Sequence, residues 1–156
     1  MQTIDAALEK LKKSPFRAKF RLSAKDKAYI SEKGLDEIRK HAEKFIKERL
    51  APAIPKNDGR QTPMRGHPVF IAQHACACCC RGCLEKWYKV PKGRPLSETE
   101  QEKIVNLLMA WIKQNIKIPR IGGFFSVFCN GKKQSRHFQD DPAVLLYSEI
   151  LRNKFL

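Results

Sequence analysis

Apolar residues recur with a period near 3.6 along most of the chain, the spacing that gives a helix one buried face. The segments that carry this pattern predict helices over about residues 3–13, 35–50, 84–90 and 98–115. A further helix is expected from Pro142 to the carboxyl terminus, because Asp141 and Pro142 together resemble a helix start. The pattern therefore predicts a mainly α protein.

Two pairs of polar residues mark where helices begin. Ser23 is followed three residues later by Asp26, and Ser97 is followed three residues later by Glu100. In such pairs each side chain accepts a hydrogen bond from the other residue's backbone N–H, which satisfies donors that a helix start leaves open. Gly34 is expected to end the helix that begins after Ser23.

Two segments have a β pattern instead. Strict alternation over residues 16–22 predicts a short strand with Arg17, Lys19 and Arg21 in one row. A small β-hairpin is predicted over about residues 122–138, where Asn-Gly supplies the residues that a tight turn requires. The expected fold class is thus mainly α with a small β-hairpin.

The length and composition indicate one domain, residues 1–156. With 42% apolar residues, a chain of 156 residues can bury a core without disulfide bonds. A polar loop at about residues 51–68 is long for so small a protein and leads into a Cys/His-rich segment. Because long loops in compact domains are commonly functional, we expect a compact helical domain whose central loop carries the function.

The net charge of +15 exceeds what solubility requires and favours a polyanionic partner, with nucleic acid as the first candidate. A solvated, lysine-rich surface is the alternative. No apolar run is long enough to span a membrane, and the amino end lacks the apolar core of a secretory signal. We therefore expect a cytoplasmic protein without a membrane partner, whose thiols stay reduced.

Five of the six cysteines lie between positions 76 and 83. In a reducing compartment such crowding favours metal or thiol chemistry, and zinc binds four Cys or His ligands in a tetrahedron. The preferred ligands are His74, Cys79, Cys80 and Cys83, with His67 as a further candidate. Reactive thiols and merely buried thiols are the alternatives.

Other residues of this region are given smaller roles. Gly82 is expected to ease the turn of the Cys80-x-x-Cys83 unit. Cys76 and Cys78 alternate with alanines and are interpreted as packing residues, and Cys129 as a core thiol in a distant strand.

The chain resembles a bacterial and phage family of small proteins described as a domain of unknown function. The resemblance rests on Asn-Asp-Gly at 57–59, Gln-Thr-Pro at 61–63, Arg-Gly-His-Pro-Val-Phe-Ile-Ala-Gln-His-Ala at 65–75 and Cys-Cys-Arg-Gly-Cys-Leu at 79–84. It covers about residues 16–115, which leaves the predicted hairpin and last helix in about residues 120–156. It implies that the polar loop, His74 and the last three cysteines of the segment form a shared centre, and it implies no activity. The family pattern has threonine at positions 76 and 78 and histidine at 88, where this chain has two cysteines and a tyrosine.

The leading functional hypothesis is a zinc-stabilised nucleic-acid-binding protein, for DNA or RNA. The residues expected to meet phosphates are Arg17, Lys19, Arg21, Arg60, Arg65 and Arg81. One alternative is a metal-dependent hydrolase of nucleic acid, with His67 and Asp58 as catalytic residues beside the metal. A further alternative is a thiol or redox protein that uses Cys80 and Cys83.

Overall fold

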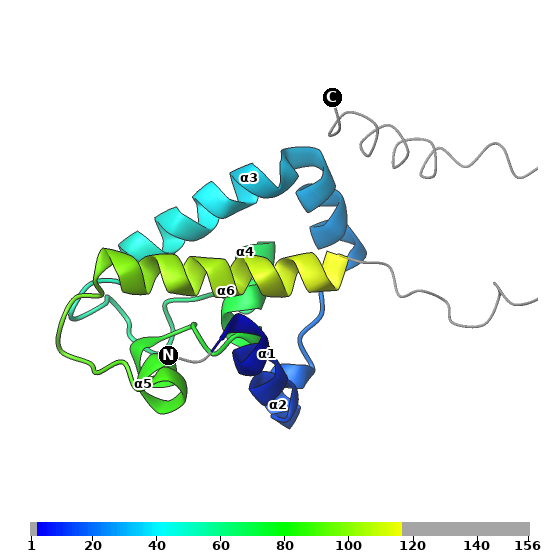
Figure 1. Cartoon of the computed structure of the whole chain (residues 1–156). Helices are drawn as coiled ribbons and strands as arrows, with labels where there is room; N and C mark the ends of the chain where they lie inside the picture. Colours follow the sequence, from blue (N-terminus) through cyan, green and yellow to red (C-terminus); the bar gives the residue numbers. More distant parts are fainter. Residues whose placement is uncertain (1–2, 117–156) are drawn as a thin grey trace, which may run out of the picture. The chain divides into compact units, whose positions relative to one another are not determined.

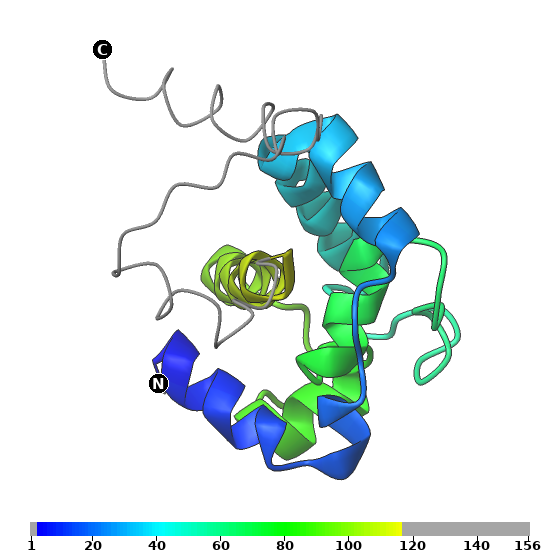
Figure 2. The ribbon, with the colours of Figure 1, turned by 90° about the vertical axis from the view of Figure 1, so that its right-hand side faces the viewer.

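Helix α6 (Glu98–Ile116) is the central helix of the computed structural model, which describes residues 3–116. The predicted capping pair forms at its start, since Ser97 N donates to Glu100 Oε2 at 2.9 Å and Glu100 N donates to Ser97 Oγ at 3.2 Å. Figure 2 looks almost along this helix and shows the other helices arranged around it. Its buried side chains are Ile104, Val105, Leu107, Leu108, Met109 and Ile112.

Helix α3 (Ala24–Arg49) packs along α6, and both views show the two helices side by side (Figures 1 and 2). The predicted capping box of Ser23 and Asp26 begins it. At Gly34 the backbone leaves the helical region, with φ +79° and ψ 157°, so that α3 is two helical segments joined by a kink. The sequence had predicted this break.

Four shorter helices complete the described fold. They are α1 (Ile4–Lys12), α2 (Pro15–Ala18), α4 (Pro68–Ala75) and α5 (Arg81–Tyr88). Helices α1 and α4 contact α6, and α4 also contacts α2 and α3. Residues 51–66 form the expected irregular loop between α3 and α4.

The mainly helical fold class is confirmed, and the part of the chain that the structure describes contains no strand. The strand expected over residues 16–22 is wrong. Ser14 caps a short helix that has Pro15 at its first turn, and residues 20–23 after this helix form no regular secondary structure. Arg17, Lys19 and Arg21 therefore do not form one row, since Arg17 is buried whereas the other two are exposed.

The predicted hairpin at 122–138, the last helix and Cys129 lie outside the described residues. Within residues 3–116, no helix is long and apolar enough to cross a membrane.

Candidate metal centre

A sharp turn between α4 and α5 brings three cysteines together. Cys76 is the C-cap of α4, and the next residue, Ala77, adopts a left-handed conformation with φ +55°. Cys78 N then donates to Gln73 O at 2.8 Å, which is the hydrogen bond of a Schellman helix end. The chain reverses here, and Cys80 becomes the N-cap of α5.

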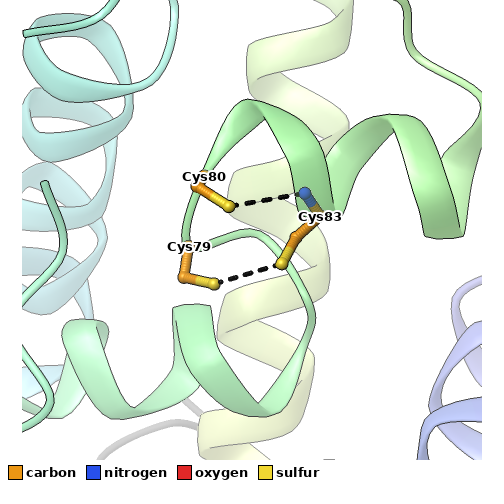
Figure 3. A group of neighbouring side chains, drawn as sticks. All are labelled: Cys79, Cys80 and Cys83. Atoms are coloured by element: carbon orange, nitrogen blue, oxygen red, sulfur yellow. Dashed lines mark hydrogen bonds between the residues drawn. The ribbon is translucent and has the colours of Figure 1, made fainter. Parts of the chain in front are cut away.

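The three sulfur atoms of Cys79, Cys80 and Cys83 all lie within 4.8 Å of one another (Figure 3). The sulfurs of Cys79 and Cys83 are 3.5 Å apart, and Cys80 Sγ accepts a hydrogen bond from Cys83 N at 3.4 Å. A zinc ion about 2.3 Å from each sulfur requires sulfur pairs about 3.8 Å apart in a tetrahedron. The spacing of the thiols therefore fits a metal ion that three of them hold.

Cys79 is buried and the other two cysteines are half-buried, and all three are free thiols. The hydrogen bond between the sulfurs of Cys79 and Cys83 lowers the pKa of the Cys79 thiol, and Arg17 lowers it further. The same contact between the sulfurs raises the pKa of Cys83, and burial raises the pKa of Cys80. Cys79 is therefore the one thiol of the cluster whose surroundings favour the thiolate, which is the form that binds a metal.

Arg17 is the charged neighbour of this cluster. Its guanidinium donates to Cys83 Sγ at 3.2 Å and to the backbone oxygen of His74 at 2.5 Å, and it lies 3.9 Å from Cys79 Sγ. The cation therefore faces two of the three sulfurs. Spacing along the sequence gave no indication of this contact, because Arg17 is 62 positions from Cys79.

The structure does not bring the His74 ring into the sulfur group, which among the described residues contains only the three cysteines. Its Nε2 lies 3.1 Å from Thr62 O, and a carbonyl only accepts, so Nε2 carries the proton and donates. The ring also stacks on Phe20 at 5.6 Å. In this arrangement His74 holds the polar loop against α4.

Cys76 and Cys78 are fully buried, and burial raises the pKa of both thiols. Cys78 Sγ donates to Cys76 O at 3.2 Å. Both residues pack in the core as neutral thiols, which agrees with the interpretation from the sequence. Gly82 lies in the first turn of α5, which the Cys80-x-x-Cys83 unit forms, and this turn requires no conformation that is limited to glycine.

The two candidate catalytic residues have separate surroundings. Asp58 Oδ1 accepts hydrogen bonds from Arg81 N and from Gln61 Nε2, both at 3.1 Å, so it supports the start of α5 beside the cysteines. His67 is the N-cap of α4, where its Nδ1 accepts from Val69 N at 3.1 Å.

The other ring nitrogen of His67 contacts a second histidine. His67 Nε2 lies 3.1 Å from His41 Nδ1, and His41 Nε2 lies 3.6 Å from Glu37 Oε1. Because the Nδ1 of His67 is an acceptor, the neutral ring carries its proton on Nε2 and donates it to His41. Burial, followed by the charge of His41, lowers the pKa of His67 to about 4.

The six basic residues assigned to phosphates divide into two groups. Lys19, Arg21, Arg60 and Arg65 are exposed. Arg81, by contrast, is 1% exposed, and its guanidinium donates to the backbone oxygens of Leu50, Pro52 and Pro91. Arg81 and the buried Arg17 thus donate to groups inside the protein, although Nε of Arg81 has no hydrogen-bond partner among the described residues.

Comparison with known proteins gives a family and no activity. No solved structure matches the chain. A family model described as "Domain of unknown function (DUF4186)" matches residues 5–113, a range that includes the polar loop and all three clustered cysteines. The match spans most of the chain, which therefore belongs to the DUF4186 family.

Proposed function

We propose that this protein is a zinc-stabilised nucleic-acid-binding protein. The observation that carries the proposal is the gathering of three thiols within 4.8 Å at the start of α5. Zinc is the first candidate because sulfur-rich, tetrahedral sites are typical of this ion. Three thiolates and one divalent cation leave one negative charge, which the guanidinium of Arg17 offsets.

The metal centre would organise two segments with exposed cations. Helix α2 is tethered through Arg17, and it is followed by Lys19 and Arg21. The loop at 51–66 is tethered through Thr62 Oγ1, which donates to Cys79 O at 2.9 Å, and this loop carries Arg60 and Arg65. Metal binding would thus position residues that meet phosphates.

An exposed aromatic side chain on α2 favours a single-stranded ligand. Phe16 is 46% exposed, although apolar side chains of this size are usually buried. Lys19 Nζ lies 4.3 Å from the centre of its ring. Aromatic rings that stack on bases next to cations that meet phosphates are the usual means of binding single strands.

The experiment is metal analysis of the purified full-length protein, with cobalt substitution to count sulfur ligands by absorption. We expect about one metal ion per chain and strong sulfur-to-cobalt bands. Cys83→Ser should lose the metal and much of the stability, because zinc binding contributes directly to folding. Cys76→Ala is the matched control, which should keep the metal since Cys76 lies outside the cluster.

Metal-free protein that is fully folded, and whose unfolding does not respond to a chelator, would contradict the metal part of the proposal. The nucleic-acid part would fail separately if metal-loaded protein bound no single-stranded oligonucleotide at low salt.

A hydrolase is the second candidate, because the described residues supply three thiolates and zinc takes a fourth ligand. In catalytic zinc sites that fourth position holds a water molecule. Asp58 is the candidate base beside the cluster. If the protein is a nuclease, Asp58→Asn should lose turnover and keep the metal, whereas absence of any turnover in the loaded protein excludes this candidate.

A further inference from the structure

A cavity of about 570 Å³ lies between α1, α5 and α6 and reaches residues of the core. Helices α1 and α5 lie on the same side of α6 (Figure 1). Most of the lining is apolar and comes from all three helices. It includes Ile4, Ala7, Leu84, Trp87, Ile104 and Leu107. Sites for small molecules commonly have this volume and this kind of lining.

Three lysines also line the cavity, namely Lys10, Lys89 and Lys103. None of the three forms an ion pair with a carboxylate of the described residues. The lining also contains one carboxylate, that of Glu100. It forms an ion pair with Arg94, in which Nη2 of Arg94 lies 2.6 Å from Oε1 of Glu100. The apolar cavity therefore has an excess of positive charge at its wall.

One of these lysines occupies a backbone position that favours glycine. Lys89 ends α5 in the left-handed conformation, with φ +60° and ψ +29°. Side chains with a Cβ atom are strained there, and glycine is the usual residue at this point of a helix end. Lys89 therefore places its ammonium group at the cavity wall from a backbone position that glycine would occupy without strain.

We propose that this cavity binds a small amphipathic anion, with an apolar chain against α1 and α6 and an anionic head group at the lysines. The proposal is independent of the metal centre and of nucleic-acid binding. The aliphatic residues of the lining suit an alkyl chain, and the lysines select an anionic head group over a cationic one.

The first experiment titrates full-length Trp111→Phe protein with monomeric decanoate and follows the fluorescence of Trp87, which lines the cavity. The substitution removes the other tryptophan. We expect a saturable change, and at least tenfold weaker binding of decyltrimethylammonium, which has the same chain and the opposite charge. Equal binding of the two probes, or no saturable binding of decanoate, would overturn the proposal.

The second experiment uses Lys89→Gly, which relieves the backbone strain and removes the cation together. We expect unchanged or higher thermal stability and several-fold weaker decanoate binding. Lys103→Gln should also weaken binding, whereas Lys113→Gln, on the same helix and outside the cavity, should not. Unchanged affinity in both cavity variants would show that the lysines do not hold the head group and would overturn the proposal.

A third variant narrows the cavity without any change of charge. Ala7→Leu adds volume at the wall of α1, and Ala6→Leu is its control because Ala6 is exposed on the same helix. We expect Ala7→Leu to reduce decanoate affinity at least fivefold and Ala6→Leu to leave it unchanged. Equal affinities of the two variants would place the alkyl chain elsewhere and contradict the proposal.

Discussion

Arg17 and Arg81 both carry a charge inside the protein, and each does so by donating to several acceptors. A buried charge is tolerated when most of its hydrogen-bonding groups are satisfied, and in Arg81 only Nε lacks a partner among the described residues. The planar guanidinium has five donors in a fixed geometry, which a lysine ammonium lacks. The type of residue matters at these positions as much as the charge.

Arg81 provides the test of this argument. Arg81→Lys keeps the charge, but one ammonium cannot reach the carbonyls of Leu50, Pro52 and Pro91 together. We expect the free energy of unfolding to fall by about 3 kcal/mol, since each buried acceptor left without a donor costs about 1–3 kcal/mol. Urea unfolding measures this, with the exposed Arg60→Lys as control. A loss below about 0.5 kcal/mol would contradict the structural role.

His67 makes the stability depend on pH. Its pKa is about 4 in the folded protein, because burial and then the charge of His41 disfavour the protonated ring. An unfolded histidine has a pKa of about 6.5, so the unfolded chain binds more protons between these values. Stability should therefore fall as the pH drops from about 6.5 to 4.

We expect His67 to contribute about 1–2 kcal/mol of this loss, less than the full shift implies because the ring is partly exposed. His67→Asn keeps a side-chain acceptor for Val69 N but does not titrate, so its loss of stability over this range should be smaller. Chemical unfolding at pH 7 and pH 4.5 gives the comparison. Equal losses in both proteins would show that His67 is not the group responsible.

At the scale of single residues, the sequence indicated the clustered cysteines and not their neighbours. Crowding made Cys79, Cys80 and Cys83 candidates, and the structure brings these three together. His74 was included because it lies near them in sequence, but its ring donates to Thr62 O instead. The contact of Arg17 depends on how α2 packs against α4, which local spacing does not encode.

At the scale of elements, the capped helices were predicted well because each has a start that the sequence specifies. Both capping boxes form. Helix α4 was not among the predicted helices, because all eight of its residues are buried and it has no polar face to show a helical period. The strand over 16–22 was predicted from the alternation of seven residues. A helix begins there instead, because Ser14 caps it and Pro15 has the fixed backbone angle that suits the first helical position.

Two glycines should respond in opposite directions to the same substitution. Gly34→Ala places a Cβ atom in a backbone conformation that is essentially limited to glycine, so we expect a loss of about 1–3 kcal/mol. Gly82 lies within α5, where an added Cβ meets nothing closer than 3.5 Å. Gly82→Ala should raise the free energy of unfolding by about 0.5–1 kcal/mol. Thermal or urea unfolding of both variants decides this, and changes of the same sign would contradict it.

At the scale of the whole molecule, the cysteine segment is a junction between distant parts of the chain. It holds α2 through Arg17 and the polar loop through Thr62. The α4 helix that precedes the segment packs on the central α6. A metal ion at this junction would stiffen both cation-bearing segments relative to the core, so metal loading and nucleic-acid affinity should rise together.

The last prediction concerns the net charge of +15 and how nucleic-acid binding responds to salt. If Lys19, Arg21, Arg60 and Arg65 each meet one phosphate of a single strand, the logarithm of affinity should fall against the logarithm of salt with a slope of about −3. Lys19→Gln should reduce the magnitude of that slope by about 0.7, since one fewer counterion is released, whereas the exposed Lys113→Gln should not change it.

Phe16→Ala should act differently, because loss of stacking lowers the affinity by about 1–3 kcal/mol and leaves the slope unchanged. Fluorescence anisotropy with a labelled oligonucleotide over a range of salt separates these effects. If the affinity did not depend on salt, or if Lys19→Gln and Lys113→Gln gave the same slope as the unaltered protein, Lys19 would not be a nucleic-acid contact.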